Sequence, residues 1–262
     1  MLILFNNKFI KPEEANISIL SESFQYGYGV FETLRTYNKK VFKDKEHIKR
    51  LFKATKIIKL EIKYTQEEIS SMLSKIAKKS EHTNQRIKVI ACKEGIIITS
   101  IELQETPELI ANGATCKTFN CSRSFPQIKS LSYLQSYIPH QSALEEGYYE
   151  AILIDKQGYL LEGAYSNIFW FEKNTLCTTP SEEILHGITR ETILDISPFK
   201  TKIKKIRLIN LLKKQEIFLT QTTKGIVPII KIDKNKIGDS QPGLKTKQLI
   251  NELQTYLKKT AS

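Results

Sequence analysis

Two predicted β-hairpins, one in each half of the chain, constrain the fold more than any other feature of the sequence. Residues 86–92 and 96–103 are rich in β-branched side chains, and a turn that contains glycine joins them. Residues 150–155 and 159–171 repeat this arrangement around a second glycine turn. Because a tight turn can only join antiparallel neighbours, we expect antiparallel strand pairs in both halves.

Segments with helical periodicity lie between and after these strands. Ile48, Leu51 and Phe52 recur at helical spacing in a segment that begins near Asp44. Together with the hairpins they predict a mixed α/β chain of the α+β kind. Pro139 should kink or shift the helix predicted around it. The other predicted helices cover 66–79, 131–147, 188–196 and 244–258, and the other predicted strands cover 2–10, 30–37, 216–220 and 226–232.

The stretch from about 105 to 128 separates two regions of regular periodicity. It contains two prolines and a glycine and shows little pattern of its own. A chain of 262 residues fits one large domain or two modest ones. We therefore predict an N-terminal α/β domain over 1–112, an interdomain segment over 113–126 and a C-terminal domain over 127–262.

The chain is basic, with a formal net charge of +12 and a sequence pI of about 9.3. Its lysines are spread from Lys8 to Lys259, no run reaches five like charges, and no basic and aromatic residues alternate as in a base-stacking surface. We interpret the charge as a solvated surface and expect no nucleic-acid partner. A basic surface also suits an anionic substrate, without requiring one.

The cysteines favour a reducing compartment. Cys92, Cys116, Cys121 and Cys177 form no C-x-x-C pair and have no neighbours that would complete a zinc site. We expect four reduced thiols, no metal and a cytoplasmic location. The N-terminus becomes polar too early for a signal peptide, and no stretch approaches the roughly 18 apolar residues of a membrane helix.

Several polar residues gain meaning only when they are considered together. Lys129, Glu162 and Arg50, taken singly, could be ordinary surface charges, and composition and spacing alone do not assign them a chemistry. They lie, however, within blocks that follow one another along nearly the whole chain. These blocks are 24–33 (FQYGYGVFET), 46–51 (EHIKRL), 129–134 (KSLSYL), 147–153 (GYYEAIL), 162–169 (EGAYSNIF), 185–190 (LHGITR) and 237–239 (IGD).

In this order and at these intervals, the blocks resemble the class IV (fold type IV) enzymes that use pyridoxal 5′-phosphate (PLP). That family includes branched-chain aminotransferases, D-amino acid aminotransferases and aminodeoxychorismate lyases. The resemblance implies a small N-terminal α/β domain and a larger PLP-binding C-terminal domain, whose β-barrel-like sheet is flanked by helices. It also implies a homodimer that acts on small amino and keto acids.

The resemblance assigns the cofactor residues one by one. Lys129 matches the lysine that holds PLP as a Schiff base and then moves protons. Glu162 matches the carboxylate that keeps the cofactor's ring nitrogen protonated. Tyr133 matches, with an offset one residue shorter than in branched-chain enzymes, a tyrosine near the ring hydroxyl. The phosphate would be bound by Arg50, by the helix start at Ile188 and Thr189, and by Thr222 or Thr223.

The residues that would bind the substrate carboxylate are less clear from the sequence. Arg35, Arg86 and Tyr28 are candidates, and both arginines could instead be structural. The segment 92–97 lacks the Arg-x-His pair of D-amino acid aminotransferases, which counts against D-amino acids, although the segment 147–153 looks closest to those enzymes. The Gly-Gly-Asn-Tyr that branched-chain enzymes carry after the lysine is absent as well. Asn167 is expected to support its hairpin, and His47 to pack in its helix.

The resemblance leaves the reaction open between two outcomes. Aminotransferases and aminodeoxychorismate lyases share the removal of the substrate α-proton by the lysine and differ in the later steps. We predict an aminotransferase, with the lyase, which makes 4-aminobenzoate for folate and releases pyruvate, as the alternative. An inactive PLP-fold protein and a basic nucleic-acid-binding protein are more distant alternatives.

Overall fold

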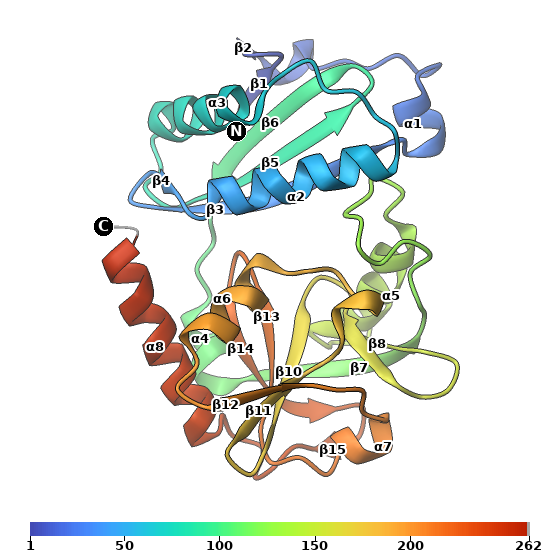
Figure 1. Cartoon of the computed structure of the whole chain (residues 1–262), viewed down its shortest axis with the longest axis vertical. Helices are drawn as coiled ribbons and strands as arrows, with labels where there is room; N and C mark the ends of the chain where they lie inside the picture. The colour runs from blue at the N-terminus through green and yellow to red at the C-terminus, as the bar shows by residue number, and fades with distance from the viewer. Residues whose placement is uncertain (261–262) are drawn as a thin grey trace. The chain divides into compact units, whose positions relative to one another are not determined.

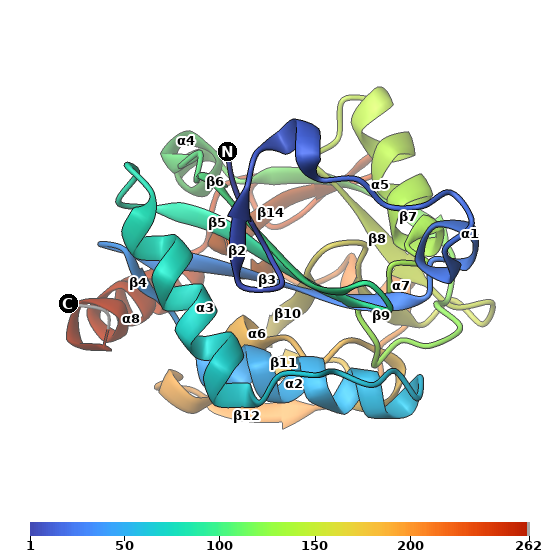
Figure 2. The same ribbon diagram turned by 90° about the horizontal axis from the view of Figure 1, so that it is seen from above.

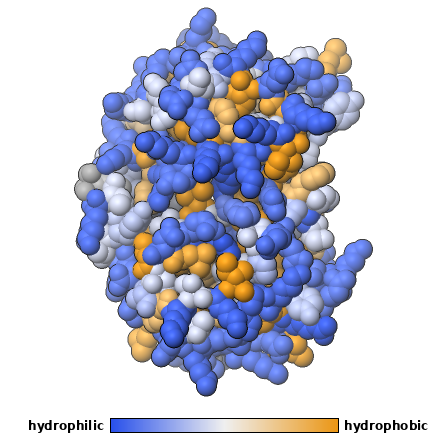
Figure 3. Space-filling view, in the orientation of Figure 1, coloured by the Kyte–Doolittle hydropathy of each residue, from blue (hydrophilic) through white to orange (hydrophobic). Residues whose placement is uncertain are grey.

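The computed structural model describes residues 1–260, which divide into two compact units, each with its own sheet and core (Figure 1). Unit 1 comprises Met1–Gln104, Ile128–Tyr133 and the end of the chain from Leu257. Unit 2 comprises Glu105–Gln127 and Leu134–Tyr256. Hydrophilic residues cover most of the visible face of both units, in keeping with the basic composition (Figure 3).

Unit 1 contains a six-stranded sheet in the described residues, with the strand order β2-β1-β6-β5-β3-β4. All neighbouring strands are antiparallel, and the predicted hairpin of 86–92 and 96–103 forms its centre. The elements are β1 (Leu2–Phe5), β2 (Lys8–Ile10), β3 (Gly29–Tyr37), β4 (Lys40–Val41), β5 (Gln85–Cys92), β6 (Gly95–Glu102), α1 (Glu22–Tyr26), α2 (Asp44–Ile57) and α3 (Gln66–Lys79).

Helices α2 and α3 pack on one face of this sheet (Figures 1 and 2). Ile48 and Leu51 of α2 and Leu73 of α3 join Leu34 of β3 in a single buried cluster. Because side chains alternate along a strand, the neighbours of Leu34 in β3 point to the opposite face of the sheet. That opposite face carries charged residues described below.

Unit 2 contains a nine-stranded, curled sheet in the described residues, with the order β12-β11-β10-β13-β14-β7-β8-β9 and β15 attached to β14. Its strands are β7 (Ala114–Asn120), β8 (Glu150–Ile154), β9 (Leu160–Gly163), β10 (Asn167–Glu172), β11 (Thr175–Thr178), β12 (Lys200–Ile203), β13 (Ile217–Gln221), β14 (Gly225–Ile232) and β15 (Asn235–Lys236). Its helices are α4 (Pro107–Asn112), α5 (Leu134–Glu145), α6 (Ile188–Ile196), α7 (Leu208–Leu211) and most of α8 (Leu244–Thr260).

The core of unit 2 lies in the curl of the sheet. Trp170, Leu219 and Val227 come from three adjacent strands and are fully buried in one cluster. Such continuous apolar strands are typical of a sheet that is covered on both faces. The antiparallel and parallel pairs together confirm the mixed α/β class that the sequence predicts.

The division into units differs from the predicted domain boundaries. The predicted interdomain segment 113–126 contains β7, which pairs in parallel with both β8 and β14 in the sheet of unit 2. Residues 128–133, placed by the sequence in the domain 127–262, pack with unit 1. They do so because their backbone pairs with that of β3 through an isolated bridge between Val30 and Ser130.

Within residues 1–260, no helix is long and apolar enough to cross a membrane.

Candidate active site

Lys129 lies in the segment 128–133, whose backbone is bonded to the start of β3. The N–H of Phe31 donates to the carbonyl of Lys129 over 2.8 Å, and the N–H of Leu131 donates to the carbonyl of Gly29 over 2.9 Å. These two bonds fix the backbone on both sides of the lysine. Its amine is therefore presented from a defined position rather than from a free loop.

Two aromatic rings surround the Lys129 amine. Its Nζ lies 4.6 Å from the ring centroid of Phe31 and 5.8 Å from that of Tyr133. The two rings meet edge to face, with centroids 5.2 Å apart. An ammonium over a ring face is stabilised by the ring's quadrupole, so this arrangement holds the amine in place. Tyr133 is thus a neighbour of the Lys129 amine, and its contact with the ring hydroxyl of the cofactor stays a prediction.

Arg50 is bound by a buried carboxylate that sequence reasoning did not single out. Its Nε donates to Oε1 of Glu32 over 2.7 Å, and its Nη2 donates to Oε2 over 2.6 Å. His47 Nδ1 donates to the same Oε2 over 2.8 Å. Burial alone would raise the pKa of Glu32, but the charge and hydrogen bonds of Arg50, with His47, lower it to about 2. The ion pair with Glu32 uses two nitrogens of the Arg50 guanidinium. A guanidinium carries five N–H donors, so this pair does not use all of them.

His47 is a buried neutral imidazole beside this pair. Burial lowers its pKa below the ordinary value of 6.5, although Glu32 pulls in the other direction, and the charges of Arg50 and Lys129 lower it further. In the described residues its Nε2 has no hydrogen-bond partner. The ring packs within α2 and holds Glu32, which agrees with the packing role expected for it.

Three cations occupy the face of unit 1 opposite to α2 and α3. In the β3–β5 register Arg35 lies across from Arg86, and Thr33 lies across from Lys88, so all four share one face. Lys88 Nζ lies 4.5 Å from the ring centroid of Phe31. Burial and the charge of Arg86 lower the pKa of Lys88. The structure thus brings the two predicted arginines together and adds a lysine that the sequence did not single out.

The other predicted substrate residue has a structural contact of its own. The Tyr28 hydroxyl donates to the carbonyl of Ile58 over 2.9 Å and approaches the carbonyl of Lys59 at 3.2 Å. These carbonyls follow the C-terminus of α2, where no helical N–H is available to them. Tyr28 therefore ties β3 to the end of α2, and its contact with substrate stays a prediction.

In unit 2, Glu162 is held by three donors from distant parts of the sequence. Asn167 Nδ2 and the N–H of Leu185 each donate to its Oε2 over 3.1 Å, and Arg123 forms an ion pair with its Oε1. The Arg123 guanidinium also donates to the carbonyl of Pro126 over 2.8 Å. Glu162 is 4% exposed, so Arg123 compensates a buried charge. Two carboxylate oxygens can accept about four hydrogen bonds, so a carboxylate in this position is an acceptor of the kind that a ring N–H needs.

The start of α6 provides backbone donors for an anion. Gly187 is its N-cap and offers no side-chain acceptor, so the first N–H groups, those of Ile188 and Thr189, are not capped by a side chain. The helix dipole favours an anion at this end. The buried Arg190, which donates to the carbonyl of Thr179 over 3.0 Å, anchors the first turn in the core.

The two predicted threonines lie in the turn that joins β13 to β14. Thr222 and Thr223 are half-buried, and Thr223 Oγ1 is 3.5 Å from Oε1 of Gln221. Nearby, Thr220 pairs in register with Asn167, and its buried Oγ1 has no hydrogen-bond partner within the described residues. A buried hydroxyl without a hydrogen-bond partner costs free energy. Thr220 is therefore an unsatisfied polar group in this region.

The residues present fit PLP by their chemistry. A lysine amine between aromatic rings, a buried carboxylate paired with arginine and a helix start without a side-chain cap match a covalent anchor, a ring nitrogen and a phosphate. Arg123, Glu32 and Lys88 were missed, although the alternation of 30–37 places a charged residue, Glu32, on the core side of β3. No cluster of His, Cys, Asp or Glu in the described part of the chain could hold a metal ion.

A family model covers most of the chain. Residues 29–232 match the model described as amino-transferase class IV. A protein of Aquifex aeolicus named "Probable branched-chain-amino-acid aminotransferase" is 32% identical, over 94% of this chain and 88% of its own length. The D-alanine aminotransferase of Listeria monocytogenes is 31% identical, over 95% of this chain and 93% of its own length. Sequence identity therefore does not separate these two kinds of relative.

Solved structures agree with this assignment. The branched-chain aminotransferase of Thermoproteus uzoniensis, solved with norvaline, has a TM-score of 0.91 and 28% identity, over 99% of this chain and 96% of that one. The branched-chain enzyme of Escherichia coli has a TM-score of 0.89 at 24% identity, over 95% of this chain and 92% of that one. These matches confirm the expected fold type IV.

Proposed function

Because the chain belongs to the class IV aminotransferase family, we propose that it transfers the amino group of an L-amino acid with an aliphatic side chain to a 2-keto acid. The aminotransferase class follows from the family. The choice of donor is supported by the relatives named for branched-chain amino acids and by the missing Arg-x-His pair at 92–97.

PLP is the cofactor of this family. When bound, it links covalently to a lysine amine and takes up the electron pair that remains when the substrate loses its α-proton. The observation that carries our residue assignment is the position of Lys129. Its amine is held over Phe31 beside the cationic face of β3 and β5.

We assign to Lys129 two tasks, anchoring the cofactor and moving the α-proton. A lysine that moves a proton must be neutral for part of the cycle, and an electropositive neighbourhood favours the neutral amine. The amines of Lys88 and Lys129 lie 4.5 Å and 4.6 Å from the centroid of the same Phe31 ring. The charges of Arg50 and Lys129 both act on His47. These cations support a reactive amine at Lys129.

Glu162 is assigned to accept the ring N–H of the cofactor. Asn167 and the N–H of Leu185 hold its Oε2, while Arg123 holds its Oε1. A carboxylate fixed in this way stays ionised and keeps its direction, so it favours a protonated ring nitrogen. For the cofactor phosphate we assign Arg50, Ile188, Thr189, Thr222 and Thr223.

The α-carboxylate of the substrate is assigned to the cationic face of unit 1. Arg35 is buried, with its guanidinium 4.0 Å from the ring centroid of Tyr37, and a stacked guanidinium presents its edge to a carboxylate. Arg86 and Lys88 lie on the same face. Replacing Lys88 with Gln is expected to raise KM for the amino donor roughly tenfold without abolishing the bound-cofactor band.

The first experiment is the absorption spectrum of the purified protein with added PLP. We expect a band near the visible edge that borohydride removes, and its loss in Lys129→Ala. Lys49→Ala, which removes an exposed lysine of α2, is the matched control and should keep the band. A wild-type protein without the band would contradict the assignment of Lys129.

The second experiment separates the possible reactions. The holoenzyme is assayed with L-leucine, L-valine, D-alanine and D-glutamate as donors to 2-oxoglutarate, and with aminodeoxychorismate for release of pyruvate. Turnover of the L-donors supports the proposal. Turnover of the D-donors alone would overturn the choice of substrate, and release of pyruvate alone would make the protein a lyase.

We further propose a homodimer in the cytoplasm. Several large apolar side chains are exposed on α5 and on the segment before it, including Leu134 at 67%, Ile138 at 54% and Phe125 at 69%. An exposed patch of this kind marks an interaction surface, and a second copy is the simplest partner. The four cysteines are free thiols, as a reducing compartment favours.

A further inference from the structure

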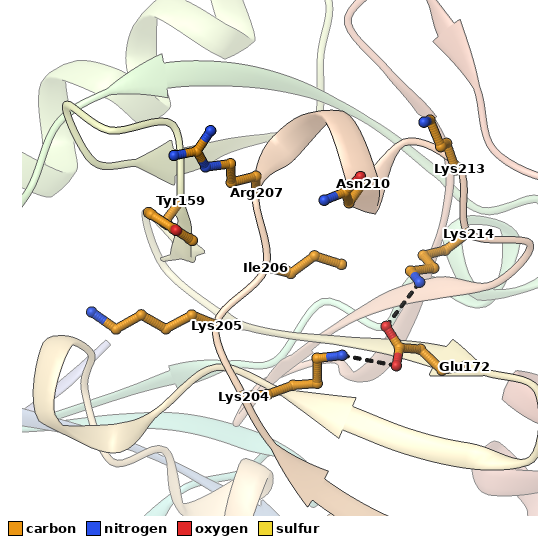
Figure 4. A pocket seen from close by; sticks show the side chains of 9 residues that line it. All are labelled: Tyr159, Glu172, Lys204, Lys205, Ile206, Arg207, Asn210, Lys213 and Lys214. Atoms are coloured by element: carbon orange, nitrogen blue, oxygen red, sulfur yellow. Dashed lines mark hydrogen bonds and ion pairs between the residues drawn. The ribbon is translucent and has the colours of Figure 1, made fainter.

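A second concave site lies in unit 2, lined by residues that have no part in the proposed cofactor or substrate contacts. It is a pocket of about 360 Å³, formed mainly by the segment between β12 and β13 (Figure 4). That volume is within the range of small-molecule sites. Its lining residues are Tyr159, Glu172, Lys204, Lys205, Ile206, Arg207, Asn210, Lys213 and Lys214.

The pocket holds an excess of positive charge. Five of its lining residues are cations and one is an acid. The carboxylate of Glu172 accepts hydrogen bonds from Lys214 over 2.8 Å and from Lys204 over 3.0 Å, as Figure 4 shows. The bond from Lys214 is the main reason that its pKa falls to about 2. This single anion leaves most of the positive charge in the pocket uncompensated.

The backbone that carries these cations is firmly attached to the sheet. The N–H of Lys204 donates to Thr178 over 3.0 Å. The N–H of Leu160 donates to Ile206, and the N–H of Leu208 donates to Gly158, each over 2.9 Å. The cations therefore project from a fixed wall, and binding an anion there needs little ordering of the chain.

The remaining cations are placed to serve a ligand. The Arg207 guanidinium lies 5.2 Å from the ring centroid of Tyr159, so its fork of donors is oriented by stacking. Within residues 1–260, Lys213 makes no hydrogen bond or ion pair. Lys205 pairs outside the pocket with Glu183 over 2.7 Å. Like charges confined to a concave surface concentrate the local potential, which attracts a compact anion.

We propose that this pocket binds a small phosphate-bearing molecule with at least two negative charges. A guanidinium fork and several ammonium groups around one concavity match a phosphoryl group, which offers three acceptor oxygens. A nucleic-acid strand fits less well, because the cations surround one small pocket and the ring of Tyr159 already stacks with Arg207. The site is separate from the phosphate contacts assigned to PLP.

The test uses the PLP-loaded enzyme, so that the cofactor's own phosphate position is filled. Binding of inorganic triphosphate and of a sugar phosphate is measured by calorimetry near physiological ionic strength. Arg207→Gln and Lys213→Gln are compared with Lys234→Gln, which removes an exposed lysine of unit 2 outside the pocket. We expect either pocket variant to weaken binding roughly tenfold, the effect of losing one charge-assisted hydrogen bond, and the control to change it less than about twofold.

Each outcome decides the proposal. Binding of triphosphate or of sugar phosphate supports it, and the ligand that binds identifies the source of the phosphate. Absence of binding by both overturns it. An equal loss in Lys234→Gln overturns it as well, because attraction would then belong to the whole basic surface. The PLP absorption band, unchanged in all three variants, keeps this result separate from the proposed aminotransferase activity.

Discussion

At the scale of single residues, two buried carboxylates, Glu32 and Glu162, are each bound by an arginine from another part of the sequence. Glu32 pairs with Arg50, and Glu162 pairs with Arg123. A buried carboxylate without such a partner would take up a proton or destabilise the fold. The arginines therefore decide both the charge and the direction of the two groups.

Arg123 is expected to position Glu162 rather than to touch the cofactor. Arg123→Met should weaken PLP binding roughly tenfold and shift the pH at which the bound-cofactor band changes, because Glu162 loses its charged anchor. The measurement is a spectroscopic titration of PLP across pH. Arg123→Lys keeps the charge and should recover part of the loss. A titration that is identical in all three proteins would remove Arg123 from this role.

Glu32 predicts a loss of stability in acid. Its pKa is about 2 in the folded protein and near 4.5 when unfolded, so the unfolded chain binds the proton first. The contribution of Glu32 to the free energy of unfolding is complete above about pH 4.5 and disappears as the pH falls toward 2. His47 adds an earlier decline below about pH 6.5, since burial lowers its pKa in the folded state.

The variant Glu32→Gln isolates the first of these effects. It should lower the free energy of unfolding by about 2 kcal/mol at pH 7. It should also flatten the decline of that free energy between pH 4.5 and 2. Denaturant unfolding at several pH values measures both. Glu61→Gln, which changes an exposed carboxylate, is the control. If the stability of Glu32→Gln declined in acid as much as that of the wild type, other groups would be the cause of the decline.

At the scale of elements, the turn before α6 connects the Glu162 carboxylate to the start of α6, where the cofactor phosphate is proposed to bind. Asn167 Nδ2 donates to Glu162 and to the carbonyl of Leu185 over 2.9 Å. Its Oδ1 lies 1.9 Å from where a Cβ on Gly187 would sit. Since φ at Gly187 is −70°, glycine is needed here for space and not for a left-handed backbone. The Asn167 side chain thus positions both the Glu162 carboxylate and the start of α6.

Gly187→Ala should therefore destabilise the fold by about 1–3 kcal/mol and weaken PLP binding, because the added methyl displaces Asn167. The decisive measurement is a double-mutant cycle with Asn167→Ala. Once Asn167 is shortened, the alanine has room, and its additional cost should be small. Strictly additive effects of the two changes would contradict this explanation.

At the scale of the whole molecule, the apolar face of α5 predicts association. Leu134 and Ile138 lie one helical turn apart and are more than half exposed. The double variant Leu134→Glu/Ile138→Glu should shift the protein from dimer to monomer in light scattering after gel filtration. Ile209→Glu, a 65% exposed residue of α7, is the matched control. A wild-type monomer would contradict the proposed dimer.

Local patterns predict much of the chain because their causes are local. The helix predicted over 188–196 is observed as Ile188–Ile196, and the strand 226–232 lies within Gly225–Ile232. The helix around Pro139 is observed over Leu134–Glu145, with the proline inside it, and begins later than the predicted residue 131. The helix thus contains the proline and does not end at it.

Strand β7, whose partners are distant in the sequence, was not predicted. Strand β7 has no hairpin signal, because it pairs in parallel with β8 and β14. The predicted strand 159–171 is divided into β9 and β10, because Glu150 binds the N–H of Tyr165 and the hydroxyl of Ser166, each at 3.2 Å. Contacts with a buried carboxylate from another strand thus divide a segment that the sequence predicts as one strand.

The sequence by itself determined the periodic elements, the order of the family blocks and the identity of Lys129, Glu162 and Arg50 as candidates, because these depend on neighbours along the chain. Only the tertiary structure decided that Lys129 packs with β3, that Arg123 binds Glu162 across 39 positions, and that Lys88 joins Arg35 and Arg86 on one face. It also gathered the cations around Arg207 into a pocket. Such contacts depend on burial and register between distant segments, which a local pattern does not specify.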